Sequence, residues 1–407
     1  MTGQEFVIVG GGLAAATAAE TLRGEGFDGT IRLVGAETHH PYIRPPLSKE
    51  YLKGDAERDT VFVQPEPWYD DNHVDLMLGR TAQELDLGAH ELTLDDGQHV
   101  HYDRLLLATG ASSRRLSVEG SDASGIHYLR TIEDSESLRE QIAAGGKRIV
   151  VVGSGWIGLE VTAAARGYGN EVTVIGMENV PLSAALGEEL GAVFGQLHRE
   201  NEVTLRLPAG IRSFAVENGR VTGVVTDSET LPADLVVVGV GAIPNVELAK
   251  RASLAIENGV LTDERMRTAA PDVFAAGDVA NAFHPVVEQH MRNEHWANAI
   301  NGGKAAAKSM LGQDGVFDDI PYFYTDQYDL GMEYSGYPPL TRGAQVVYRG
   351  NLAGREFVAF WHRDGRVVAG MNVNVWDVNE DVQSLIRSAR RVDLGRLTDT
   401  DIPIADV

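Results

Sequence analysis

The fold is decided by the stretch Phe6-Val7-Ile8-Val9-Gly10-Gly11-Gly12-Leu13-Ala14-Ala15. A short apolar run, a glycine-rich turn and a helical pattern that continues to Leu22 predict a strand, a tight turn and a helix. Within that context Gly10, Gly12 and Ala15 fill a G-x-G-x-x-G/A pattern. The first glycine permits the turn, the second lets a pyrophosphate approach the backbone, and the small third residue lets the helix pack close to the sheet.

The same design returns near the middle of the chain. Arg148-Ile149-Val150-Val151-Val152-Gly153 is followed by Gly155 and Gly158, with Trp156 and Ile157 inside the turn. A helix to about Tyr168 should follow. In both copies the start of the helix would turn unpaired N–H groups and a positive dipole end toward a phosphate. The sequence therefore predicts two dinucleotide-binding sites.

Each copy continues into a second strand, after which an acid often binds a ribose. In the first copy the strand Ile31–Val34 is followed by Ala36 and then Glu37, which we expect to accept hydrogen bonds from a ribose. In the second copy the strand Glu171–Ile175 is followed by Gly176, and an acid appears only at Glu178. Both acids are therefore displaced from the usual position.

Buried strands at residues 103–110 and 234–241 close the two copies in the same way. A short strand at residues 272–278 indicates that the chain then returns to the first domain and enters a helix. We expect an α/β fold with two Rossmann-type dinucleotide-binding domains of the glutathione reductase kind and a C-terminal α+β domain. The expected boundaries are 1–112 and 242–320 for the first domain, 113–241 for the second and 321–407 for the third.

The C-terminal domain carries its own strand signal. Phe357–Trp361 and Arg366–Gly370 flank His362-Arg363-Asp364-Gly365, which predicts a hairpin with Asp-Gly at its tip. A helix is expected over residues 381–391.

Composition excludes several kinds of chemistry. The chain has 407 residues and no cysteine, so disulfides, thiolate nucleophiles, Cys-ligated zinc and chain-borne iron–sulfur clusters are excluded. Its 35 basic and 59 acidic side chains give a net charge of −24, which opposes binding to nucleic acid or to an anionic membrane. The histidines His39, His40, His290 and His295 follow no metal-ligand spacing, so no metal site is expected. No signal peptide or spanning segment is evident, and a cytoplasmic protein is expected.

Two bound dinucleotides imply electron exchange between them. Hydride transfer needs a donor and an acceptor ring in contact, and a flavin with a nicotinamide satisfies that need. We therefore expect FAD and NADH as cofactors.

Several motifs, in order along the chain, resemble the FAD-dependent ferredoxin reductases of bacterial oxygenase systems, the family of putidaredoxin reductase and rhodocoxin reductase. The motifs are Pro41-Tyr-Ile-Arg-Pro-Pro-Leu-Ser-Lys49, Tyr128-Leu-Arg-Thr131, Ile157-Gly-Leu-Glu160, Gly241-Ala-Ile-Pro-Asn245, Ala276-Gly-Asp278, Asn293-Glu-His-Trp-Ala-Asn298 and Tyr322-Phe-Tyr-Thr-Asp-Gln327. The related disulfide reductases share the architecture, but their catalytic dithiol cannot exist here.

The resemblance implies roles for particular residues. Asp278 would bind the ribityl chain of FAD, and Lys49 would place a cation beside the flavin ring, paired with Glu160 of the facing domain as the catalytic pair. Trp296 would lie against the isoalloxazine and Arg130 would contact FAD. The alternatives are a surface role for Lys49, a core role for Trp296 and a helix cap for Asp278.

The resemblance also implies that Arg44 and Pro45 lie near the ring, and that Ala14 and Ala82 contact phosphate and adenine through their backbones. The complete set of expected cofactor-binding residues is Gly10, Gly12, Leu13, Ala14, Ala15, Glu37, Arg44, Pro45, Lys49, Ala82, Ala108, Thr109, Gly110, Arg130, Gly153, Gly155, Trp156, Ile157, Gly158, Glu160, Glu178, Gly241, Gly277, Asp278, Glu294, His295 and Trp296. The sequence departs from the family at Tyr324, where Trp is usual.

The implied activity is hydride transfer from NADH to FAD, followed by two single-electron transfers to a small [2Fe-2S] ferredoxin that serves a cytochrome P450 or a Rieske oxygenase. A basic patch that includes Arg387, Arg390 and Arg391 is the expected docking surface on a monomer or homodimer. Two alternatives stay open: an NADH-dependent reductase or oxidase of a small acceptor, and an NADH-sensing flavoprotein that resembles apoptosis-inducing factor.

Overall fold

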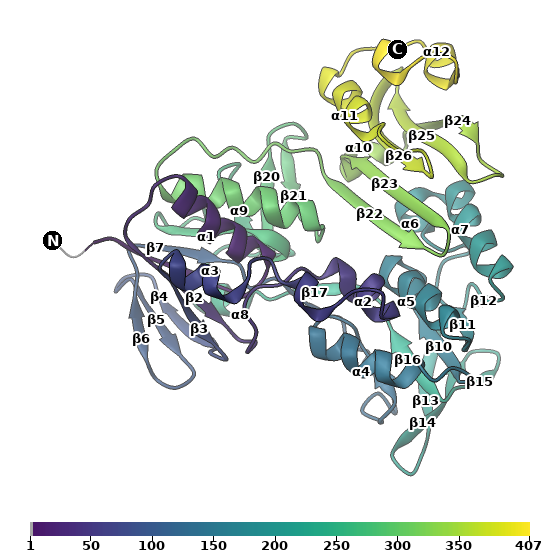
Figure 1. The fold of residues 1–407 in the computed structure, drawn as a ribbon, viewed down its shortest axis with the longest axis horizontal. Coiled ribbons are helices and arrows are strands. Elements are labelled where there is room, and N and C mark those ends of the chain that lie inside the picture. The colour runs from purple at the N-terminus through teal and green to yellow at the C-terminus, as the bar shows by residue number, and fades with distance from the viewer. Residues whose placement is uncertain (1–2) are drawn as a thin grey trace.

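The computed structural model describes residues 3–407. Figure 1 shows three regions: the N-terminal region, the middle of the chain and the C-terminal module. Each region is built around its own five-stranded sheet.

The first sheet is entirely parallel, and the chain enters it twice. Its order is β19 (Val273–Ala275), β7 (Arg104–Leu107), β1 (Glu5–Val9), β2 (Thr30–Gly35) and β3 (Val74–Leu78). β19 follows the second dinucleotide region in the sequence, so the first sheet is completed by a segment that comes after that region. The predicted return of the chain is therefore confirmed.

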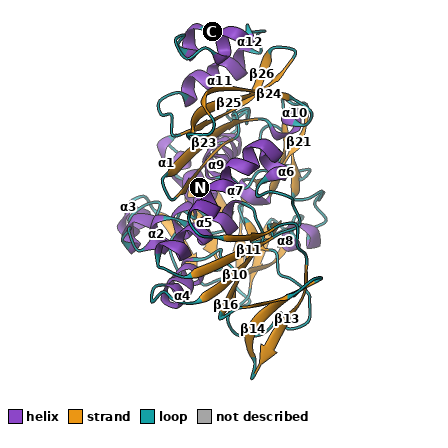
Figure 2. Cartoon of the chain, turned by 90° about the vertical axis from the view of Figure 1, so that its right-hand side faces the viewer, coloured by secondary structure: helices purple, strands orange, loops and turns teal. Residues whose placement is uncertain are grey.

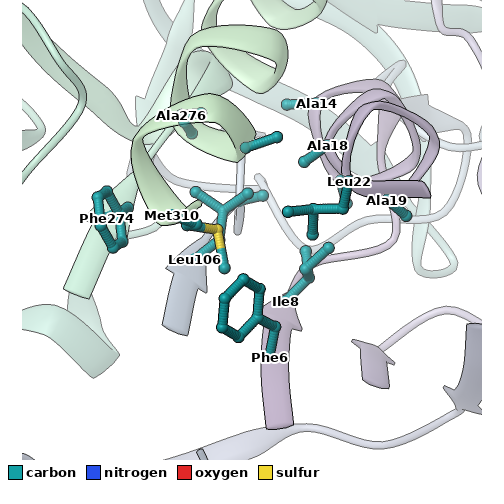
Figure 3. Close-up of a cluster of buried hydrophobic side chains, with 14 of the residues drawn as sticks. Phe6, Ile8, Ala14, Ala18, Ala19, Leu22, Leu106, Phe274, Ala276 and Met310 are labelled. Atoms are coloured by element: carbon teal, nitrogen blue, oxygen red, sulfur yellow. The ribbon is translucent and has the colours of Figure 1, made fainter. Parts of the chain in front are cut away.

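Two helices cover one face of this sheet, α1 (Leu13–Gly24) and α9 (Trp296–Met310). Figure 3 shows the apolar side chains that fill the space between the sheet and these helices. The strands contribute Phe6, Ile8, Leu106 and Phe274; α1 contributes Ala14, Ala18, Ala19 and Leu22; and α9 contributes Met310. Small residues let the helices approach each other: a Cβ at Gly303 would lie 2.6 Å from the carbonyl oxygen of Ala14. The alanine-rich sequence of α1 thus determines how closely α9 packs.

The remaining elements of the first region connect or border the sheet. They are α2 (Glu50–Lys53), α3 (Glu66–Asp71), β4 (Ala82–Asp86), β5 (Glu91–Leu94), β6 (His99–His101), α8 (Glu247–Arg251), β18 (Val260–Thr262), β20 (Ala280–His284), β21 (Gln289–Met291) and the 3-10 turns η1 (Pro45–Ser48), η2 (Arg58–Val61) and η3 (Gly277–Val279).

The segment after β19 differs from the prediction. Asp278 lies in the three-residue turn η3, and the hairpin of β20 and β21 follows it, so the next helix, α9, begins only at Trp296. The prediction that the Gly-Asp turn enters a helix is wrong. The apolar residues Val279, Ala280 and Ala282 pack as strand and turn residues in the core, which sequence alone did not distinguish from a helix start.

The second sheet is also parallel, in the order β12 (Thr204–Arg206), β11 (Glu171–Ile175), β10 (Arg148–Val152), β16 (Leu235–Val238) and β9 (Ile126–His127). The accompanying elements are α4 (Ile132–Ile142), α5 (Trp156–Gly167), α6 (Ser183–Leu186), α7 (Glu188–Glu200), β13 (Ile211–Glu217), β14 (Arg220–Thr226) and β15 (Thr230–Pro232). Figure 2 shows β13 and β14 projecting at the end of the molecule opposite the C-terminus.

The chain crosses between the two dinucleotide regions in an antiparallel ribbon of β8 (Ala111–Ser113) and β17 (Ala242–Pro244). The expected boundary at residues 112/113 falls within β8, and that at 241/242 falls at the start of β17. We keep these boundaries, and that at 320/321, as the division of the chain that we propose.

The C-terminal sheet is antiparallel, in the order β22 (Tyr322–Gln327), β23 (Leu330–Gly336), β26 (Arg366–Val373), β25 (Glu356–Arg363) and β24 (Gln345–Asn351). The predicted hairpin is confirmed, with positive φ at both Asp364 and Gly365, as a type I′ turn requires. The last helices are α10 (Pro338–Thr341), α11 (Asn379–Ser388) and α12 (Leu394–Thr398), followed by η4 (Ile404–Asp406). The helix predicted over 381–391 corresponds to α11, which begins two residues earlier and ends three residues earlier. β22 contacts both α5 and α9.

Candidate functional site

A cavity of about 700 Å³ extends from the start of α1 to the start of α5 and is bordered by β22. Its volume is within the range of about 300–1,000 Å³ that is usual for ligand sites. The predicted site residues that line it are Gly10, Gly12, Leu13, Ala14, Glu37, Arg44, Pro45, Lys49, Ala82, Ala108, Thr109, Gly110, Arg130, Trp156, Ile157, Glu160, Gly277, Asp278, Glu294, His295 and Trp296. The fold therefore brings most of the predicted set together.

The other predicted residues lie outside the wall of the cavity. Ala15 is fully buried in the core beneath α1. Gly153, Gly155 and Gly158 form the turn before and within α5, and Gly241 precedes β17 with φ +100°. Glu178 follows β11.

The first glycine turn leaves space for a phosphate. Gly10 has φ +133°, and a Cβ there would lie 2.0 Å from the carbonyl oxygen of Ala108, so only glycine fits. A Cβ at Gly12 would meet nothing within 4 Å. Gly12 also caps α1 without a side-chain hydrogen bond, and the first turn holds no acid. The N–H groups at this helix end are thus free to bind an anion.

The second turn repeats this arrangement at α5. A Cβ at Gly153 would lie 2.1 Å from the carbonyl oxygen of Gly239, and one at Gly158 would lie 2.2 Å from that of Gly153. At Gly155, which caps the helix with no side-chain hydrogen bond, a Cβ would meet nothing within 4 Å. Two glycines permit close packing and the third leaves the helix end open, as a dinucleotide site requires.

Glu37 lies at the wall of the cavity in a cluster of three residues. Its Oε1 accepts a hydrogen bond from Arg44 Nη2 at 2.8 Å, and its Oε2 accepts one from the hydroxyl of Tyr42. Burial raises the pKa of Tyr42 above its usual value, so this hydroxyl stays protonated and donates. A carboxylate has about four lone-pair positions, so Glu37 retains acceptor capacity for a ribose.

Unpartnered polar atoms at the other side of the cavity test whether a cofactor fits. Arg130 pairs with Asp278 through Nη2, but its buried Nε has no partner. Nδ1 of His295 is also buried without a partner, and burial lowers the pKa of His295 to about 4. Buried polar atoms are almost always hydrogen-bonded, so these two atoms in one wall fit a polar ligand such as FAD. Trp296 is 37% exposed at the first residue of α9, which excludes a core role.

Lys49 and Glu160 form the predicted ion pair. Lys49 Nζ lies 3.0 Å from Glu160 Oε2, and the two side chains are only 6% and 3% exposed. Ser48 donates a second hydrogen bond to the same oxygen, while Thr325 of β22 donates to Oε1 at 2.6 Å. The ammonium also lies 5.4 Å from the centre of the Tyr324 ring. A surface role for Lys49 is excluded by this burial.

The end of β11 is crowded where the second copy lacks the usual acid. A Cβ at Gly176 would lie 2.6 Å from Ser154 Oγ, so a side chain at this position would require Ser154 to shift. The two carboxylate oxygens of Glu178 accept hydrogen bonds from backbone N–H groups at the start of α6, Oε2 from Ser183 and Oε1 from Ala184. The structure therefore uses Glu178 to cap a helix.

The neighbouring strand brings a cation to this end of the sheet. Arg206 of β12 pairs in register with Ile175, but its Nε lies 3.3 Å from Glu229. Arg212, at the start of β13, pairs with Asp227. Both guanidinium groups are thus partly neutralised.

Sequence reasoning missed several residues of the site. Ser48 and Thr325 contact Glu160, and Arg80 and Arg251 line the cavity. Ser48 and Thr325 stood inside motifs already singled out, but a hydroxyl carries no sequence signal of its own. The three arginines of the expected basic patch, Arg387, Arg390 and Arg391, are all exposed, and Arg390 donates a hydrogen bond to the carbonyl oxygen of Val407.

Residues 3–407 hold neither a metal-binding cluster nor a membrane-spanning helix. No group of three or more His, Cys, Asp or Glu side chains in this range has the arrangement needed to hold a metal ion. Within the same range no helix has both the length and the apolar character needed to cross a bilayer.

Two glycine-rich turns, each opening an uncapped helix on a parallel sheet, and a shared cavity with a buried Lys–Glu pair define a flavin- and nicotinamide-dependent oxidoreductase. The chain belongs to the pyridine nucleotide-disulphide oxidoreductase family, whose model matches residues 4–303, and residues 322–407 match the reductase C-terminal domain. Members of this family bind FAD and use NAD(H).

Individual relatives are similar over nearly the whole chain. Rhodocoxin reductase of Rhodococcus erythropolis is 38% identical over 91% of this chain and 86% of the relative. The ferredoxin–NAD(+) reductase component of the anthranilate 1,2-dioxygenase system of Burkholderia cepacia is 38% identical over 99% of this chain and 98% of the relative. The reductase in a covalent putidaredoxin reductase–putidaredoxin complex superposes with a TM-score of 0.95, at 33% identity over 99% and 98% of the two chains.

Proposed function

We propose that this protein passes electrons from NADH through FAD to a small [2Fe-2S] ferredoxin that serves a cytochrome P450 or a Rieske oxygenase. The observation that carries the proposal is the buried Lys49–Glu160 pair, which joins the two dinucleotide regions at the wall of one cavity. Relatives named as ferredoxin reductases support the choice of acceptor.

Each residue has a role that follows from its position. FAD, when bound, supplies a ring that accepts a hydride and releases electrons singly. Lys49 places a positive charge in the cavity, and Glu160 holds that ammonium in position. Arg130 and Asp278, which pair directly with each other, would hold the polar part of the cofactor at this wall, and His295 would present a neutral ring nitrogen to it. The residues Tyr322–Tyr324 and Trp156 help to exclude water from the cavity.

The two nucleotides would use separate helix ends. The start of α1 would bind the pyrophosphate of FAD, and the start of α5 would bind that of NADH. Because Trp156 and Ile157 of α5 line the same cavity as Lys49, the nicotinamide would enter from the side of α5.

Steady-state turnover tests the acceptor. Purified protein with NADH is expected to reduce a [2Fe-2S] ferredoxin with a much higher kcat/KM than a quinone or oxygen. Faster turnover with a quinone or oxygen would support a reductase of small acceptors instead. Flavin that NADH reduces and that no acceptor reoxidises rapidly would support an NADH-sensing protein.

A further inference from the structure

A buried chain of hydrogen bonds leads from Glu160 through β22 of the C-terminal domain to α7 of the second dinucleotide region. Its members are Thr325 and Gln327 on β22 and His198 on α7. The side chains of these three residues are at most 1% exposed, and none of the three lines the cavity. Each is therefore a buried polar group with no direct contact with a ligand in that cavity.

Every bond in the chain points the same way. Thr325 Oγ1 donates to Glu160 Oε1 at 2.6 Å, and Gln327 Nε2 donates to Thr325 Oγ1 at 3.2 Å. Gln327 Oε1 lies 2.9 Å from His198 Nε2, and because an amide oxygen can only accept, that nitrogen carries the proton. Burial lowers the pKa of His198 to about 4, so the ring is neutral at pH 7. Each residue thus donates to the next, and the series ends at the Glu160 carboxylate.

The carboxylate that ends the chain is held at both oxygens by different elements. Lys49 and Ser48 bind Oε2, whereas Thr325 binds Oε1. Without Thr325, Glu160 would be held at one oxygen only and could rotate, and the ammonium of Lys49 would follow it. Together with Ser48 and the carbonyl oxygen of Pro45, which Lys49 Nζ also reaches at 3.3 Å, the hydroxyl therefore helps to fix where the positive charge of Lys49 lies.

We propose that Thr325, Gln327 and His198 are positioning residues, which fix the Glu160 carboxylate and through it hold the Lys49 ammonium at the cavity wall. This inference rests on the proposed function. It makes the C-terminal domain a part of the redox site, because β22 supplies both Thr325 and Gln327.

If Thr325, Gln327 and His198 served only to stabilise the fold, they would not need polar side chains. A buried polar pair can be replaced by apolar groups of the same shape with little change in stability. The polar chain is instead satisfied at each step, and the group where it ends is charged. Its function should therefore be visible in the electrostatics of the site.

The test replaces the hydroxyl that reaches Glu160. Thr325→Val removes it at nearly constant volume, Thr325→Ser keeps it, and Gln327→Met cuts the link to His198. Thr262→Val is the matched control, because Thr262 is also buried on a strand but its hydroxyl has no partner and lies away from the cavity. The measurements on the FAD-loaded proteins are the flavin midpoint potential and the rate of flavin reduction by NADH.

We expect Thr325→Val to lower the midpoint potential and to slow flavin reduction about tenfold, as is common for residues that orient a ligating group. Gln327→Met should act in the same direction with a smaller effect. Thr325→Ser should restore both values, and Thr262→Val should leave both unchanged.

A wild-type midpoint potential in Thr325→Val and Gln327→Met would overturn the inference, as would an equal shift in Thr262→Val. The proposed function fails separately, if NADH does not reduce the flavin of the wild-type protein or if no ferredoxin is reduced.

Discussion

His198 should make the protein less stable as the pH falls below 6.5. The ring is fully buried between α7 and β22, and burial lowers its pKa to about 4 from an ordinary value of 6.5. In the folded chain the ring binds a proton less readily than in the unfolded chain. Its contribution to stability is therefore fully present above pH 6.5, and it is lost as the pH falls toward 4.

The expected magnitude follows from these two pKa values. At pH 5 most unfolded chains carry the proton on this ring and most folded chains do not, which lowers the free energy of unfolding by about 2 kcal/mol relative to pH 7. Below pH 4 the loss approaches its limit of about 3 kcal/mol. The cause is the desolvation of a charged ring, because Nε2 keeps its acceptor on Gln327 in both protonation states.

Urea unfolding at saturating FAD, followed at several pH values between 5 and 7.5, measures this effect. His198→Gln removes the titrating group, so its loss of stability between pH 7 and pH 5 should be about 2 kcal/mol smaller than that of the wild type. His101→Gln is the control, because His101 is exposed on β6. Equal pH dependence in the wild type and His198→Gln would refute the reasoning.

Three further outcomes are expected. Lys49→Met should slow flavin reduction in stopped-flow mixing with NADH without changing the circular dichroism. Lys53→Met, outside the cavity, should reduce at the wild-type rate, and a wild-type rate in Lys49→Met would remove Lys49 from the mechanism. The ratio of kcat/KM should favour NADH over NADPH, since Arg206 and Arg212 are already paired with acids, and a ratio that favours NADPH would show that a cation overcomes this pairing. Acid precipitation should release FAD into the supernatant, because there is no cysteine for a thioether link; flavin retained in the pellet would contradict this.

Much of the site could be predicted because dinucleotide binding constrains the backbone. Gly10 and Gly153 are required by a close approach to a carbonyl oxygen, and Gly12 and Gly155 leave open space. These requirements act over a few consecutive residues, so they leave a readable pattern. The Lys49–Glu160 pair was predictable only through the resemblance of two motifs, since 111 residues separate its members.

Other features could not be predicted because they depend on contacts across the fold. Glu178 was expected near a ribose, yet its oxygens bind the backbone at the start of α6. Asp278 was expected to enter a helix, and a turn and a hairpin follow it instead. In both cases a short polar or apolar sequence was compatible with two local structures, and packing selected one of them.

The sequence by itself determined the two Rossmann units and the return of the chain to the first sheet, because glycine spacing and apolar runs are local properties. It also excluded dithiol chemistry, because the chain has no cysteine. Only the tertiary structure decided what surrounds Glu160. Ser48, Lys49 and Thr325 come from distant parts of the chain, and hydrogen bonds to one carboxylate depend on the positions of α5 and β22 in space, which no single segment encodes.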